Sequence, residues 1–204
     1  MRCIYCDKEI KKITFTSLFL ERDPLCIECR RQLQVKRRCF LLGELKAESF
    51  YEYDGLFKSL LLQYKECCDE ALKDVFLYGL KDYIRIRYAG YHLLFVPSST
   101  QKRQMRGFDH LELIFEDIGL PRVKGLKMKE DLIQEGKNAK ERNRMMDNYI
   151  YEGEELNRVL IVDDVMTTGS SILGVYEAIK DRTKSVKALS LANKSNTFHF
   201  KNKV

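Results

Sequence analysis

Two adjacent carboxylates, Asp163 and Asp164, stand between four β-prone apolar residues and a hydroxyl-rich turn. The apolar residues 159–162 predict a strand buried on both faces, and residues 172–181 predict a helix. The turn between strand and helix consists of Thr167, Thr168, Gly169, Ser170 and Ser171. Backbone N–H groups at the start of a helix can bind a phosphate, and paired carboxylates can bind the vicinal hydroxyls of a ribose, directly or through Mg2+. The segment therefore predicts an anion site with a sugar-binding rim.

Two other interpretations of this segment have less support. A generic nucleotide-binding loop would carry a G-x-G-x-x-G pattern or a Walker lysine, and residues 159–171 contain neither. A strand, turn and helix with a purely structural role would not need adjacent carboxylates at the end of a buried strand.

A second polar loop follows another predicted strand, residues 91–96, which Pro97 ends. Loops at the carboxyl ends of strands are where α/β sheets bind their ligands. Three basic residues of this loop are candidates for an anion contact: Lys102, Arg103 and Arg106. Basic loop residues are often simply solvated. We favour a functional role for Arg106 and keep both interpretations open for the other two.

Four cysteines near the N-terminus form two C-x-x-C pairs, Cys3 with Cys6 and Cys26 with Cys29. Two such pairs complete a tetrahedral thiolate site, and their separation is typical of a zinc ribbon. Four thiolates leave no open position for water, so we expect structural Zn2+. The alternatives are free thiols or a redox pair. The segment between the pairs, residues 13–20, predicts a strand.

Basic residues are concentrated in the first quarter of the chain. The 204 residues carry 36 Lys and Arg against 30 Asp and Glu, and residues 1–46 carry 11 against 6. Within that part, the candidates for a nucleic-acid contact are Arg30, Arg31, Lys36, Arg37 and Arg38. This run predicts either a phosphate-contacting helix or a solvated connector.

The rest of the sequence predicts a globular α/β protein. Hydrophobic residues make up 45% and charged residues 32%, which excludes wholesale disorder. No signal peptide is visible and no apolar run is long enough to span a membrane, so we expect no membrane insertion. An odd number of cysteines, seven, favours a cytoplasmic location.

Apolar periodicity places the elements that must position these sites. It predicts strands at 50–53, 91–96, 122–127 and 149–151, and helices at about 56–83 and 109–118. Two helices are expected within 56–83, with a break near Cys67 and Cys68. We divide the chain into a zinc-ribbon domain, residues 1–46, and an α/β domain, residues 47–204.

The segment Val159–Ser171 resembles the phosphoribosyl pyrophosphate (PRPP) signature of type I phosphoribosyltransferases at all thirteen positions. Together with the cysteine pairs, it resembles the ComF family of phosphoribosyltransferase-like proteins. Residues 96–109 are similar to the family's strand, proline and Arg-Gly-Phe-Asn segment, and residues 127–142 to its mobile loop. The chain differs from the family at Asp109 and His110, where Asn and Gln are usual.

The resemblance implies a Rossmann-like parallel sheet and a PRPP site with Mg2+. It implies catalytic roles for Asp163, Asp164 and Arg106 if the protein turns over substrate. The turn 167–171 would hold the 5′-phosphate, while Lys102 and Arg103 would join Arg106 at the leaving pyrophosphate.

Two functions follow as expectations. The first is an accessory protein of DNA uptake in natural transformation, with single-stranded DNA, a competence helicase of the ComFA type and other uptake proteins as partners. The second is a PRPP-dependent transferase in nucleotide salvage. A noncatalytic PRPP sensor lies between them, and the sequence does not decide whether turnover occurs.

Overall fold

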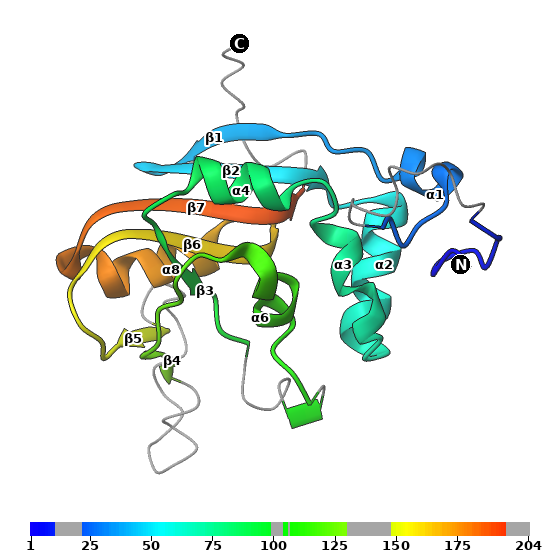
Figure 1. The fold of residues 1–204 in the computed structure, drawn as a ribbon. Helices are drawn as coiled ribbons and strands as arrows, with labels where there is room; N and C mark the ends of the chain where they lie inside the picture. Colours follow the sequence, from blue (N-terminus) through cyan, green and yellow to red (C-terminus); the bar gives the residue numbers. More distant parts are fainter. Residues whose placement is uncertain (11–21, 99–103, 106, 130–147, 195–204) are drawn as a thin grey trace.

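The fold is taken from a computed structural model, which describes residues 1–10, 22–98, 104–105, 107–129 and 148–194. Its centre is a five-stranded sheet in the order β1-β2-β7-β6-β3 (Figure 1). The strands are β1 Arg38–Leu42, β2 Leu45–Glu52, β3 His92–Phe95, β6 Leu156–Met166 and β7 Thr183–Asn193. Neighbouring strands from β2 to β3 run parallel, whereas β1 pairs antiparallel with β2. The parallel α/β sheet expected from the sequence is confirmed.

The helices agree only in part with the apolar periodicity: the region expected to hold two helices, 56–83, contains three, and that periodicity did not predict the helix at 27–32. They are α1 Ile27–Gln32, α2 Gly55–Glu66, α3 Lys73–Phe76, α4 Lys81–Arg87, α6 His110–Ile114 and α8 Ser170–Ile179, with short 3-10 turns at Glu70–Leu72, Glu116–Ile118 and Lys180–Arg182. Helix α2 ends immediately before Cys67, and Cys68 has a positive φ of 53°, which breaks the helix as expected.

Apolar side chains cover both faces of the sheet. On one face, helices α2, α3, α4 and α6 contribute to a cluster that includes Leu60, Phe76 and Leu111. On the other face, α8 contributes Ile172 and Val175 to a second cluster. The central strands are buried on both sides, which explains the continuous apolar run that precedes Asp163.

A two-stranded antiparallel sheet lies beside α8, formed by β4 Leu126–Met128 and β5 Tyr149–Tyr151 (Figure 1). Strand β5 has the predicted bounds, whereas β4 begins later than the predicted 122–127. Gly125 precedes β4 with φ +97°, and a side chain there would approach the Glu152 carbonyl to 3.0 Å.

The N-terminal segment packs against the rest of the protein. Leu25 and Leu33 are buried in the same apolar cluster as α2, and Arg30 of α1 donates to the Val75 carbonyl oxygen at 3.2 Å. Residue 46 lies within β2, so the sheet itself includes residues from both sides of the expected boundary. That two separately folding units, 1–46 and 47–204, make up the chain is still a prediction. The predicted strand at 13–20 lies outside the described residues.

No helix in the described part of the chain is long and apolar enough to cross a membrane.

Candidate functional site

The turn that follows β6 depends on a glycine at position 169. Gly169 has φ +77°, and a Cβ atom at this position would overlap the side chain of Leu42. Helix α8 begins at the next residue. Thr168 and Ser170 share a hydroxyl hydrogen bond of 2.7 Å, and the Ser170 N–H donates to Thr168 Oγ1 at 3.3 Å. The glycine requirement is therefore both conformational and steric.

The two carboxylates lie inside β6, because β6 pairs with β7 as far as Met166. The sequence placed them at the strand's end. Strand side chains alternate between the two faces of a sheet, so adjacent aspartates point into different environments. The C-terminal ends of β3, β6 and β7 meet at this edge, where Val96 N–H donates to Val162 and Lys194 N–H donates to Met166. This is the edge at which parallel sheets bind ligands.

Asp164 is held by two cationic or potentially cationic groups. Lys65, near the end of α2, donates from Nζ to Asp164 Oδ2 at 2.5 Å. His110, the first residue of α6, donates from Nε2 to the same oxygen. Both His110 and Asp164 are buried. The sequence analysis did not identify Lys65, which is 99 positions from Asp164, and noted His110 only as a departure from the family.

His110 is itself fixed by its surroundings. Asp109 caps α6 through hydrogen bonds from the backbone N–H groups of Leu111 and Glu112. Ser98, after the end of β3, lies 3.4 Å from His110 Nδ1, and the Tyr64 hydroxyl donates to the His110 carbonyl oxygen at 3.0 Å. Asp109 thus fixes the start of the helix from which His110 contacts Asp164.

The two neighbouring aspartates have opposite pKa shifts. For Asp163, burial and the charge of Asp164 raise the pKa to about 8. For Asp164, burial would raise the pKa, but the hydrogen bond from His110 and the charge of Lys65 outweigh burial and lower it. Without a ligand, Asp164 is therefore the ionised member of the pair, and Asp163 retains its proton near neutral pH.

The predicted pyrophosphate contacts Lys102, Arg103 and Arg106 lie outside the described residues, as does most of the mobile-loop pattern. Thr167 and Thr168 are exposed at the sheet edge, and Ser170 and Ser171 begin α8. The structure therefore brings together the carboxylates and the turn.

The four N-terminal cysteines converge on one point. Their sulfur atoms all lie within 4.8 Å of one another, and Cys6 Sγ and Cys26 Sγ are 3.6 Å apart. A tetrahedral zinc site with Zn–S bonds of about 2.3 Å places its sulfurs about 3.8 Å apart. Backbone hydrogen bonds shape the first pair, from Asp7 N–H to the Cys3 carbonyl and from Cys3 N–H to Lys8. The cluster therefore fits a closed structural metal site, and zinc is the metal that its donor set favours.

The basic run after the second cysteine pair is largely occupied by internal contacts. Arg30 forms a salt bridge with Asp23 at 2.6 Å, and its guanidinium lies 4.8 Å from the ring centre of Tyr78. The other ion pairs of the run are Lys36 with Glu52, Arg37 with Glu48 and Arg38 with Glu52. Arg31 is exposed and has no ion pair among the described residues. These basic residues lie on the last turn of α1, on the connection after it and at the start of β1, and most of them already have acidic partners.

Comparison with known proteins finds a relative that matches almost the whole chain. No family model matches the chain. The chain is 26% identical over 219 residues to the competence protein ComFC of Streptococcus pneumoniae (strain ATCC BAA-255 / R6), an alignment that covers 94% of this chain and 99% of ComFC.

Several solved structures are distantly similar. A hypoxanthine phosphoribosyltransferase from Staphylococcus aureus is 17% identical, with 66% of this chain and 69% of that chain covered and a TM-score of 0.37. An orotate phosphoribosyltransferase from Aeropyrum pernix is 21% identical, with 80% and 77% covered and a TM-score of 0.37.

The similarity to ComFC covers 94% of this chain, which is more than either the N-terminal cysteine region or the α/β sheet alone. The chain is therefore similar to ComFC over almost its whole length, and the resemblance to the ComF family expected from its motifs is confirmed.

Proposed function

We propose that the protein is a cytoplasmic accessory factor of DNA uptake in natural transformation, and that its phosphoribosyltransferase-like domain binds PRPP or another phosphoribosyl ligand with Mg2+. The observation that carries the ligand proposal is the segment 159–171, which combines a buried strand, two carboxylates and a glycine-dependent turn at the carboxyl edge of a parallel sheet. The assignment to DNA uptake rests on the similarity to ComFC.

The two carboxylates have different roles in this proposal. Asp164 already accepts from Lys65 and His110, so we assign it to positioning β6 and the turn. Asp163 is the carboxylate that remains to contact ribose hydroxyls or Mg2+. The backbone N–H groups of residues 168–171 would bind the 5′-phosphate. The oxygen donors present are those that Mg2+ prefers, and the metal would supply charge neutralisation for the pyrophosphate group.

Titration calorimetry with PRPP and Mg2+ tests the ligand proposal. The wild type is expected to bind, and Asp163→Asn is expected to bind at least about tenfold more weakly. Asp181→Asn is the matched control, because Asp181 is exposed in the 3-10 turn after α8. Absence of PRPP binding by wild type would contradict the proposal, as would equal binding by wild type and Asp163→Asn.

We further propose that the N-terminal module contacts single-stranded DNA or a helicase of the ComFA type. The cations of the run that remain accessible are Arg31, which is exposed, and Lys36 and Arg37, whose side chains are 51% and 53% exposed. Lys36 is held by Glu52 at 2.7 Å, whereas Arg37 lies 3.5 Å from Glu48. Arg31 and Arg37 are therefore the residues most available to a new partner. Nucleic-acid phosphates attract such side chains through a salt-dependent contact.

Fluorescence anisotropy with a labelled single-stranded oligonucleotide tests the DNA contact. Arg31→Gln combined with Arg37→Gln should weaken binding and reduce its salt dependence. Lys58→Gln combined with Lys124→Gln removes the same charge from exposed positions elsewhere and should have little effect. Equal losses in both double variants would contradict a specific role for this module.

A PRPP-dependent transferase in nucleotide salvage is the second function, and the complete signature favours it. A noncatalytic PRPP sensor uses the same site without turnover. Release of pyrophosphate from PRPP when nucleobases are added separates the two: turnover that is lost in Asp163→Asn supports the transferase, and binding without turnover supports the sensor.

A further inference from the structure

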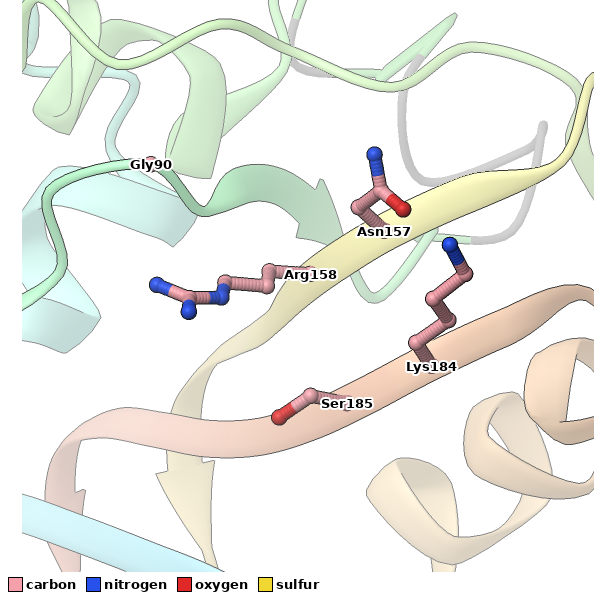
Figure 2. A pocket seen from close by; sticks show the side chains of 5 residues that line it. All are labelled: Gly90, Asn157, Arg158, Lys184 and Ser185. Carbon is pink, nitrogen blue, oxygen red and sulfur yellow. The ribbon is translucent and has the colours of Figure 1, made fainter.

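A basic pocket lies at the end of the sheet opposite the signature turn. It has a volume of about 560 Å3 and is lined by Gly90, Asn157, Arg158, Lys184 and Ser185. Figure 2 shows four of these residues on the first positions of β6 and β7, and Gly90 on the loop before β3. Arg158 extends towards Gly90 on the same side as Ser185, whereas Asn157 and Lys184 extend to the other side. None of these residues belongs to the segment 159–171.

The pocket is distant from the proposed PRPP site. Arg158 and Ser185 are register partners near the start of their strands. Thr167 follows Arg158 by nine positions along and just beyond β6, which at about 3.3 Å per residue is roughly 30 Å. One small ligand therefore cannot occupy both places.

Positive charge collects at this end of the sheet without acidic partners. Arg158 and Lys184 line the pocket, and Lys187 lies two positions beyond Ser185 on the same face of β7. None of these three cations forms an ion pair with a carboxylate in the described part of the chain. The cations of the basic run after Cys29 are different, because most of them have acidic partners. An anion is the partner that these three lack.

Tyr91 contacts two of the three cations, Arg158 and Lys187. Its ring centre lies 4.8 Å from Lys187 Nζ and 5.8 Å from the Arg158 guanidinium carbon, and its hydroxyl lies 3.5 Å from Ser185 Oγ. Burial would raise the pKa of Tyr91, but hydrogen bonds from Ser185 and Lys187 and the two positive charges lower it. The local field therefore favours negative charge.

We propose that this pocket binds a small ligand that carries a diphosphate or triphosphate group. Arg158 offers a planar fork that matches phosphate oxygens, and Ser185 can donate a hydrogen bond from the same face of the strands. Lys184 offers a point charge and Asn157 an amide donor from the other face, so a ligand has to lie across the strand ends to contact both pairs. Lys187 does not line the pocket and adds positive charge behind Tyr91. A single carboxylate would leave cations uncompensated. Gly90 presents no side chain at the opening, and the volume is within the range of about 300–1,000 Å3 for small-molecule sites.

A small ligand fits the pocket better than a nucleic-acid strand does. Single-stranded nucleic acids are usually held by bases stacked on accessible aromatic rings. The aromatic residue here, Tyr91, is only 7% exposed, and its ring is flanked by Lys187 and Arg158. We therefore assign the pocket to the phosphate chemistry of a small molecule.

Amide NMR spectra of the full-length protein, titrated with inorganic pyrophosphate and separately with ADP, test the proposal. We expect shifts at Gly90, Arg158 and Lys184 that saturate. Saturation with both probes assigns the pocket to nucleotides, and saturation with pyrophosphate alone assigns it to a free polyphosphate. Shifts at 168–171 report the other site separately, so this test does not depend on the proposed function.

In the double variant Arg158→Gln/Lys184→Gln, the Kd obtained from the shifts at Gly90 should rise by at least about tenfold. The shifts at 168–171 should be unchanged, which also shows that the variant folds. Lys58→Gln/Lys124→Gln removes equal charge elsewhere and should bind as wild type does. The proposal is overturned if neither probe shifts the pocket residues, if the control loses as much affinity, or if only a single-stranded oligonucleotide shifts them.

Discussion

Lys65 and Asp164 are 99 positions apart in the chain, yet the lysine Nζ lies 2.5 Å from the aspartate Oδ2. The contact joins the end of α2 to the strand that carries the signature turn. Side-chain exposures of 20% for Lys65 and 12% for Asp164 place the pair largely out of water. The ion pair favours the ionised form of Asp164. Asp163 forms no such ion pair among the described residues, and its pKa is raised instead of lowered.

Replacing Lys65 with Met should destabilise the protein. The change leaves the buried Asp164 carboxylate with the hydrogen bond from His110 but without its lysine partner. Breaking a largely buried ion pair on one side typically costs about 1–3 kcal/mol. Urea unfolding measures the difference. Lys58→Met on the same helix is the control, since Lys58 is exposed, and it should change the free energy of unfolding by less than about 0.5 kcal/mol. Equal effects of the two substitutions would refute the structural role of Lys65.

Asp163→Asn should stabilise the protein without Mg2+, increasingly so as pH rises. The pKa of Asp163 is raised to about 8 in the folded state, whereas an unfolded aspartate titrates near 3.9. Between these values unfolding releases a proton, so the wild type loses stability as pH increases through this window. Asparagine does not titrate, and its advantage should be larger at pH 8 than at pH 5, by about 1–3 kcal/mol.

Thermal unfolding of both proteins in EDTA at pH 5 and pH 8 measures this difference. Asp181→Asn, at an exposed position, controls for the loss of one negative charge. A stability difference between Asp163→Asn and wild type that does not grow with pH would show that Asp163 is ionised in the folded protein.

His110 should tolerate glutamine better than leucine. Glutamine can donate an amide N–H to Asp164 in place of Nε2, whereas leucine leaves the buried carboxylate without that donor. We expect His110→Gln to remain within about 1 kcal/mol of wild type and His110→Leu to lose about 2 kcal/mol or more. Urea unfolding of the two variants is the measurement. If leucine is tolerated as well as glutamine, the hydrogen bond does not position Asp164.

The cysteine cluster should bind one zinc ion per chain. Cys26→Ser is expected to lose the metal and to unfold at a lower temperature, because a structural metal site contributes directly to folding. Elemental analysis and thermal unfolding measure the two effects. Cys67→Ser provides the control: Cys67 is exposed and outside the cluster, so the variant should retain its zinc. A wild-type protein without bound metal would contradict the zinc assignment.

Features encoded in contiguous residues were predictable from the sequence. The segment 159–171 contains its own strand, turn and helix start, and the cysteine spacing specifies a metal cluster without knowledge of the fold. Even so, β6 runs to Met166, beyond the predicted strand, because pairing with β7 continues past the apolar residues. Asp164 and Met166 are buried in this extension, so the apolar run ends before either the pairing or the burial of the strand does.

Features that depend on distant partners were not predictable. Neither Lys65 nor His110 carries a local signal for its contact with Asp164, since that contact arises from the packing of α2 and α6 on β6. The internal ion pairs of the basic run were likewise not predictable from residues 1–46 alone. Glu48 and Glu52, which pair with its cations, lie just beyond that range and face them through the β1–β2 hairpin.

The central claim is that the turn 167–171 binds a phosphoribosyl ligand. A crystal of the protein soaked with PRPP and Mg2+ tests it most directly. We predict density for the 5′-phosphate against the backbone N–H groups of residues 168–171, with the ribose hydroxyls directed towards Asp163. An empty turn in a crystal soaked at saturating PRPP, or PRPP bound elsewhere on the molecule, would contradict the claim.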